Sequence, residues 1–213
     1  MKTTLYLIRH GESEGNKLRT FLGHSDRDLT PLGYEQAEKV GAYLRDFPID
    51  VIYSSDLSRA YHTALPTARA KGLEVICSRN LREIFAGEWE NRPFAELKTK
   101  FADDYDVWLR DIGNARCTNG EAVAELAARI LSELVRIVGE NEGKSIAIFT
   151  HATPIRALKT LFDDGALADM ASTPWVSNAS VTHLTCEDGN FSVLAYGVDF
   201  FQGDSLTKLN KNV

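Results

Sequence analysis

The chain has 213 residues, 44% of them hydrophobic and 25% charged, which is typical of one globular domain that buries its own core. With 30 acidic and 24 basic residues the net charge is −6, so the overall field does not attract nucleic acid or anionic membranes. Three scattered cysteines without a CxxC pair exclude a disulfide framework and a zinc ribbon, and no apolar run reaches the length of a membrane span, so we expect a cytoplasmic protein.

The first elements alternate between strand and helix. Residues 3–8 (TTLYLI) predict a short strand that runs into a polar loop containing glycine. Thr30 and Pro31 are typical of a helix N-cap and a first helical position, and apolar residues follow at helical spacing as far as Phe47. A second strand is predicted over residues 50–53.

Polar residues directly after this second strand indicate the next helix. Ser54, Ser55 and Asp56 form a capping cluster, from which we expect that helix to begin. Residues 73–77 predict a third strand. The stretch 91–117 is rich in aromatic and charged residues and predicts an insertion that covers one end of the sheet.

The second half of the chain continues the alternation. Thr118 and Glu121 have the T-x-x-E spacing of a capping box, in front of a long helix with one apolar stripe. Residues 145–149 (SIAIF) predict a buried strand, and residues 181–186 and 191–196 predict a closing hairpin.

This order of elements predicts the fold class. Strands that alternate with helices indicate an α/β protein, here a three-layer sandwich around a mostly parallel central sheet. We expect a single domain over residues 1–213, with a small cap-like insertion at 91–117 and a loosely held tail at 203–213.

Candidate catalytic residues follow the predicted strands. Arg9 and His10 end the first strand, Arg59 lies early in the helix after the second, Glu83 follows the third, and His151 follows the SIAIF strand. Ligands of open parallel sheets bind beyond the carboxyl ends of the strands, so we expect these side chains to converge there.

This set of residues matches the needs of phosphate chemistry. Two arginines can bind the oxygens of a phosphate monoester, and a neutral imidazole can attack its phosphorus to form a covalent intermediate. A second histidine can stabilise the transition state, and a carboxylic acid can protonate the leaving oxygen. The sequence has no metal-ligand motif, so we predict neither a metal nor a cofactor.

Six segments carry a resemblance to a known family. The chain resembles the histidine phosphatase superfamily, in its phosphoglycerate-mutase-like branch. The similar segments follow in the family's order: LIRHGESEGN at 7–16, LTPLGYEQA at 29–37, SSDLSRAYHTA at 54–64, REIFAGEWEN at 82–91, NGEA at 119–122 and THATPIRAL at 150–158.

The resemblance implies a role for each matching residue. His10 matches the phosphorylated histidine and Glu83 the proton donor. The residues that match the phosphate pocket and the border of the substrate are Arg9, Asn16, Gly23, Arg59 and His151. Ala152 stands where many relatives have glycine, but its backbone N–H remains, so we expect it to bind substrate as well.

The sequence predicts a metal-independent phosphomonoesterase for a small phosphorylated metabolite, and it leaves alternatives open. One is a phosphoglycerate mutase. The segment from Trp89 to Cys117 looks shorter than the corresponding region of the classical mutases, and a shorter segment would exclude water poorly from the site, which disfavours this alternative. Another is a noncatalytic phosphate-binding module. We expect Trp89 and Trp108 to serve packing.

Sugar phosphates, phosphoglycerates, nucleoside phosphates and a cobalamin precursor all fit as substrates, and the oligomeric state is open.

The three remaining histidines are isolated from the candidate catalytic residues. We expect structural or surface roles for His24, His62 and His183.

Overall fold

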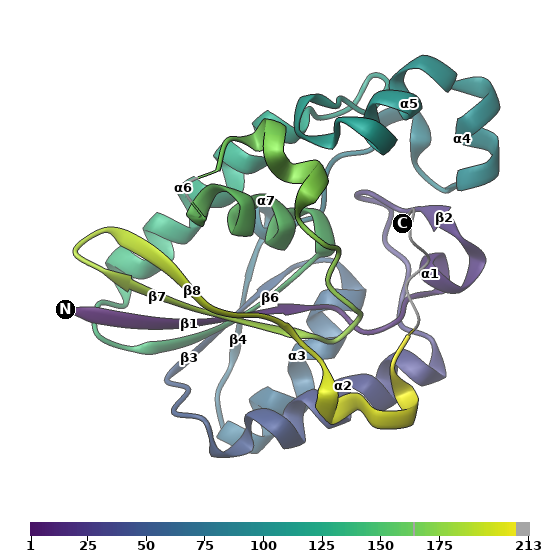
Figure 1. Ribbon diagram of the computed structural model, residues 1–213. Coiled ribbons are helices and arrows are strands. Elements are labelled where there is room, and N and C mark those ends of the chain that lie inside the picture. The colour runs from purple at the N-terminus through teal and green to yellow at the C-terminus, as the bar shows by residue number, and fades with distance from the viewer. Residues whose placement is uncertain (164, 208–213) are drawn as a thin grey trace.

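A six-stranded sheet forms the centre of the computed structural model, which describes residues 1–163 and 165–207 (Figure 1). Its strands lie in the order β4, β3, β6, β1, β7, β8. Their bounds are β1 Lys2–Arg9, β3 Val51–Ser55, β4 Val75–Ser78, β6 Ser145–Thr150, β7 Val181–Glu187 and β8 Asn190–Val198. The first four in the sheet are parallel, and the hairpin of β7 and β8 adds an antiparallel edge beside β1. The predicted α/β architecture and hairpin are therefore present.

Strand β1 shows why the sheet lies between two helical layers. Leu5 and Leu7 pack into one core with helices α6 (Val123–Glu140) and α7 (Ala152–Phe162). Tyr6 and Ile8 point to the opposite core, beneath α2 (Pro31–Tyr43) and α3 (Ser58–Lys71). Successive side chains of a strand face opposite sides, so a continuous apolar run is buried on both faces. Figure 1 shows the two helix pairs on opposite sides of the sheet.

A third core lies beyond the carboxyl end of the parallel strands. It contains the fully buried Trp89, together with Trp108, Phe21 and Leu126. Trp89 is thus a packing residue, as expected. Its residues come in part from β2 (Thr20–Phe21), α4 (Phe94–Lys100), α5 (Ala102–Arg110) and α6. Helix α1 (Glu14–Leu18) precedes β2, and β5 (Arg92–Pro93) pairs with it.

Two predicted helix starts are wrong. Helix α3 begins at Ser58 after Leu57, because Ser55 bonds His151 and Asp56 pairs with Arg82 instead of capping. The Thr30 cap of α2 is confirmed, since its hydroxyl accepts from the N–H of Gly33.

The second error concerns the T-x-x-E box. Thr118 donates to Asp104, and Glu121 pairs with Arg129. Helix α6 starts later, after Ala122, whose N–H donates to the carboxylate of Glu125 at 2.9 Å. The contacts of Thr118 with Asp104 and of Glu121 with Arg129 therefore replace the predicted capping box.

The expectation of a loose tail is wrong for its first part. Ser205 is buried, and its carbonyl accepts from Gln36 of helix α2 at 2.7 Å. The rest of the tail, residues 208–213, lies outside the described residues. Within the described residues, no helix combines the length and the apolar character that a membrane crossing requires.

Candidate active site

A cleft of about 630 Å³ opens where the parallel strands end. Seven of the eight residues predicted for the site line it, and the eighth, His151, is buried beside His10 with ring centroids 5.2 Å apart. The seven are Arg9, His10, Asn16, Gly23, Arg59, Glu83 and Ala152. The structure therefore brings the whole predicted set together from segments far apart in the sequence.

Close backbone packing fixes the loop after β1. A Cβ added to Gly11 would lie 2.5 Å from the carbonyl oxygen of Gly33, and one added to Gly33 would collide with the carbonyl of Glu12. Both positions therefore need glycine, because the loop lies directly against the start of helix α2. This contact holds His10 at the floor of the cleft.

The imidazole of His10 is oriented through one of its nitrogens. Its Nδ1 lies 2.7 Å from the carbonyl oxygen of Gly11, which can only accept, so Nδ1 carries the proton. Burial, and then the charges of Arg59 and Arg9, hold the pKa of His10 well below its ordinary value. The ring is therefore neutral, and the lone pair of Nε2 is free.

His151 shares this environment. Burial, followed by the charges of Arg59 and neighbouring groups, also lowers its pKa well below the ordinary value. Its Nε2 lies 2.9 Å from the hydroxyl of Ser55, whose oxygen also accepts from the N–H of Leu57 at 3.3 Å. His151 Nε2 and the Ser55 hydroxyl thus share a hydrogen bond, whereas the other ring nitrogen, Nδ1, is buried without a hydrogen-bond partner.

Arg59 is fixed by two carbonyls of one loop. Its Nη2 donates to Gly23 at 2.8 Å and its Nη1 to Ser25 at 3.0 Å. Gly23 has a φ of +53°, and a Cβ there would collide with Ala86, which explains the glycine. The pKa of Arg59 is lowered to about 10 by burial, so the guanidinium stays charged near neutral pH.

Arg9 also lines the cleft. One of its terminal nitrogens donates to the carbonyl of Val176 at 2.5 Å, while its Nε is buried without a partner. Burial lowers its pKa to about 10, with a smaller contribution from Arg59. Two buried guanidinium groups and one unpartnered N–H thus face a site whose nearby carboxylate is Glu83. Such a site favours an anion, because the two positive charges exceed the one negative charge.

Asn16 belongs to a polar network below the cleft. Its side-chain oxygen accepts from the N–H of Ser13 and from the amide of Asn178, each at about 3 Å. Asn178 also donates to the carbonyl of His10 at 3.1 Å. The side-chain oxygen of Asn16 is thus occupied, so only its NH₂ group remains for a ligand.

The side chain of Glu83 contacts the N-terminus of helix α7. Its carboxylate accepts from the N–H of Ile84 at 2.8 Å and of Thr153 at 3.3 Å. Ala152 and Thr153 are the first residues of that helix, whose N-terminus directs its N–H groups at the cleft. The substitution at Ala152 leaves this backbone geometry in place.

Several contributors escaped the sequence analysis. Asn178, Ser55 and Trp175 act through contacts with residues far away in the chain, which leave no local signal. Glu90 accepts from the N–H groups of His24 (2.7 Å) and Ser25 (2.6 Å) and so clamps the loop that holds Arg59. The one sequence signal for Glu90 was its position in the REIFAGEWEN segment at 82–91, which resembles the family.

The other histidines have separate partners. His24 contacts the carbonyl of Glu83 at 2.8 Å, His62 pairs with Asp28, and His183 stacks on Tyr6. Within residues 1–163 and 165–207, no group of three or more His, Cys, Asp or Glu side chains is placed to hold a metal ion.

Known proteins resemble this chain along most of its length. Phosphoserine phosphatase 1 of Hydrogenobacter thermophilus is 34% identical over 154 residues, which cover 72% of this chain and 73% of that protein. The adenosylcobalamin/alpha-ribazole phosphatase of Salmonella typhimurium is 30% identical over 190 residues, or 89% of each chain. The solved structure of Bacillus stearothermophilus YhfR matches with a TM-score of 0.89 at 30% identity, covering 92% of this chain and 98% of that one.

These likenesses confirm the predicted α/β fold and the predicted class of enzyme, a phosphatase. The model of the histidine phosphatase superfamily (branch 1) matches residues 5–199. The chain belongs to the histidine phosphatase superfamily, branch 1.

Proposed function

We propose that this chain hydrolyses small phosphomonoesters through a phosphohistidine at His10. The observation that carries the proposal is the orientation of this ring. Its Nδ1–H is held by the Gly11 carbonyl at 2.7 Å, which leaves an unprotonated Nε2 in a cleft lined by Arg9 and Arg59. The relatives named as phosphoserine and alpha-ribazole phosphatases support hydrolysis of a small phosphorylated substrate.

In this mechanism the two arginines bind the phosphate. The buried Nε–H of Arg9 lacks a partner, and a phosphoryl oxygen would supply one. Arg59 adds its charge, with its orientation set by Gly23 and Ser25. The charges compensate the substrate dianion, so binding costs little reorganisation of the site.

His151 and Glu83 complete the first step. Nε2 of His10 attacks phosphorus while the bond to the leaving oxygen breaks, and the Glu83 carboxyl gives its proton to that oxygen. The Nδ1–H of His151 donates to the phosphoryl oxygens as their charge redistributes. A dianion beside Glu83 favours the protonated carboxyl, because like charges repel.

The second step reverses these roles. Glu83, now a carboxylate, takes a proton from water, whose oxygen attacks phosphorus and displaces Nε2 of His10. Inorganic phosphate leaves and the neutral imidazole is restored. The arginines supply the positive charge in both steps, so we propose that no metal or other cofactor takes part.

We also propose a role for residues 91–117 and a cellular compartment for the protein. Residues 91–117 contain α4 and α5 and contribute Phe94 and Trp108 to the cleft, which supports the view of this stretch as a cap on a single domain. The cysteines Cys77, Cys117 and Cys186 are free thiols, which supports a reducing cytoplasm.

The test is a panel of phosphorylated metabolites with release of inorganic phosphate as the readout. We expect release that disappears in His10→Ala and persists in His62→Gln, a control histidine that pairs with Asp28 outside the cleft lining. Conversion of 3-phosphoglycerate to 2-phosphoglycerate with little free phosphate would overturn hydrolysis in favour of the mutase reaction. Retained activity in His10→Ala would overturn the proposed nucleophile.

A further inference from the structure

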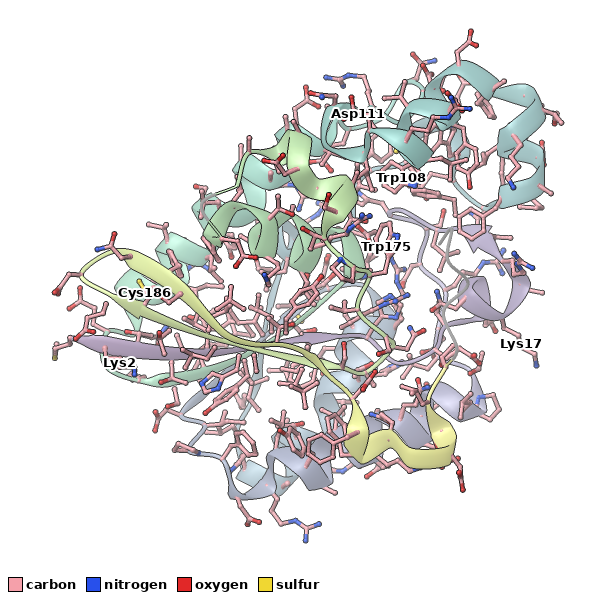
Figure 2. All side chains as sticks on the ribbon, in the orientation of Figure 1. Lys2, Lys17, Trp108, Asp111, Trp175 and Cys186 are labelled. Atoms are coloured by element: carbon pink, nitrogen blue, oxygen red, sulfur yellow. The ribbon has the colours of Figure 1, made fainter. Side chains whose placement is uncertain are left out.

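The outer wall of the cleft is aromatic. Phe21 of β2, Phe94 of α4, Trp108 of α5 and Trp175, from the loop before β7, line it above the phosphate end. Figure 2 shows Trp108 and Trp175 near one another beyond the end of the sheet, and their ring centroids are 6.4 Å apart. Phe94 and Trp175 are partly exposed, so their rings are open to a ligand.

Among the described residues that line the cleft, the ionisable ones belong to the phosphate end. They are Arg9, His10, Arg59 and Glu83. All four are used by the proposed chemistry. A leaving group such as serine would bring a carboxylate against the aromatic wall, where it would lose water and gain no charged partner among these residues.

Trp175 is held in place from behind. The Arg156 guanidinium lies 4.3 Å from the centre of its ring, close enough for a cation–π contact. Arg156 is itself buried, and it donates to the carbonyls of Thr173 and Met170 at 2.6 and 2.7 Å. The indole is therefore immobilised before any ligand arrives, which reduces the entropy lost on binding.

Arg156 also connects this wall to the phosphate end. It lies on helix α7, whose first residues, Ala152 and Thr153, line the cleft beside Glu83. The same rigid helix thus sets the distance between the phosphate and the ring of Trp175. A substrate that contacts both the arginines and Trp175 must therefore carry its apolar part at a fixed distance from phosphorus.

From these observations we propose that the aromatic wall selects a substrate whose leaving group is an uncharged alcohol bearing a flat apolar ring. The inference rests on the proposed phosphatase function and names its substrate class. The phosphate binds at the arginines, and the ring lies against Trp175, Trp108 and Phe94. Flat rings gain from edge and face contacts with aromatic side chains beyond the area they bury.

A matched set of substrates tests this proposal. The set is 2-phenylethyl phosphate, 2-cyclohexylethyl phosphate, ethyl phosphate and O-phospho-L-serine, each assayed by phosphate release. We expect kcat/KM for the phenylethyl ester to exceed those for ethyl phosphate and phosphoserine by about 100-fold, and that for the cyclohexyl ester by about fivefold. The flat ring separates the first two substrates, because their leaving groups are otherwise similar alkyl alcohols.

Variants locate the effect in the wall. Trp175→Leu keeps an apolar side chain and removes the flat ring, so we expect KM for 2-phenylethyl phosphate to rise about tenfold, and by a much larger factor than KM for ethyl phosphate. Phe94→Leu provides a second variant on another element, should the first fold poorly. Phe200→Leu is the control, because Phe200 is 75% exposed and lies outside the cleft lining.

The outcomes separate the two proposals. Hydrolysis of phosphoserine as fast as, or faster than, the phenylethyl ester would overturn the ring subsite and leave the His10-dependent phosphatase standing. Equal rates for the phenyl and cyclohexyl esters, or an equal loss on ethyl phosphate in Trp175→Leu, would also overturn it. Hydrolysis of none of the four esters, nor of any in the wider panel, would overturn both.

Discussion

The rings of His10 and His151 lie 5.2 Å apart between centroids, with their planes at 61°. Burial and the charge of Arg59 hold the pKa of both well below that of a histidine in water. Nε2 of His10 carries a free lone pair, because the Gly11 carbonyl holds its Nδ1–H, and Nδ1 of His151 is buried without a hydrogen-bond partner. The two neutral imidazoles therefore lie side by side at the cleft, where we propose that His10 acts as the nucleophile and His151 as a hydrogen-bond donor.

These depressed pKa values make a prediction about stability. Below the ordinary pKa of about 6.5 the unfolded chain binds protons at these histidines that the folded chain does not, so the free energy of unfolding falls as pH falls. Their contribution is present above that pH and is lost towards the lower pKa of the folded state. His151→Asn should reduce the slope by close to one proton near pH 5.5, or about 1.4 kcal/mol per pH unit, and by less near pH 7, where an unfolded histidine is mostly neutral. Urea unfolding between pH 7 and pH 5.5 measures the slope.

A control separates this effect from a general loss of stability. His62→Asn removes a histidine that pairs with Asp28 at 2.6 Å and has a partly exposed side chain. This variant should leave the dependence of the unfolding free energy on pH largely unchanged. If His151→Asn and the parent chain had the same slope, His151 would titrate like a histidine in water, and the account of its neutral state would be wrong.

Glu90 should act on phosphate binding through Arg59. Its carboxylate holds the N–H groups of the loop whose carbonyls, at Gly23 and Ser25, accept from that guanidinium. Glu90→Gln puts an NH₂ group against one of these donors, so the loop should shift. We expect the inhibition constant of inorganic phosphate to rise about tenfold, which corresponds to about 1.4 kcal/mol.

A double-mutant cycle tests the route of this effect. In an Arg59→Met background Glu90→Gln should have almost no further effect on phosphate inhibition, because the coupled group is gone. Glu38→Gln, which changes an exposed carboxylate paired with Arg69, is the matched control. Equal losses from Glu90→Gln in both backgrounds would show that Glu90 merely stabilises the fold.

The role of Glu83 should depend on the leaving group. Glu83→Gln keeps the size of the side chain and removes the acid, so it should slow phosphorylation by an alkyl phosphate by about 10² to 10⁴-fold. A nitrophenolate leaves without help, so nitrophenyl phosphate should lose much less. The comparison needs single-turnover kinetics, because attack of water can limit the steady state. The same loss on both substrates would mean that Glu83 organises the cleft and that another group donates the proton.

Turnover should not need a divalent metal. Arg9 and Arg59 supply the positive charge at the cleft, and their pKa values of about 10 keep them protonated at neutral pH. Activity measured after exhaustive treatment with chelator should match that of untreated protein. A loss that magnesium or zinc restores would contradict this mechanism.

Much of the fold and of the site could be predicted because the relevant signals are local. The apolar run of β1 and the spacing of Thr30 and Pro31 determine nearby backbone, and the structure follows them. The convergence of His10 and His151 follows from a general property of parallel sheets: their strands end at the same edge.

The errors occur where distant partners compete for polar side chains. Ser55 resembles a helix cap, but it orients His151 instead, 96 positions away. Asn178 supports His10 across 168 positions from a loop without any pattern of its own. Trp108 was expected to serve packing, and it does lie in a core, but it also lines the cleft. These contacts cannot be predicted from a single sequence, because each side chain could form other hydrogen bonds or contacts equally well.

The central claim is the covalent intermediate at His10, and rapid quenching tests it most directly. Protein mixed with ³²P-labelled substrate and quenched in alkali should carry label that acid removes, since phosphoramidates are labile in acid. Peptide mapping should place it on His10, and His10→Ala should carry none while His62→Gln labels normally. Label found on a serine, an aspartate or His151, or turnover by His10→Ala, would contradict the account.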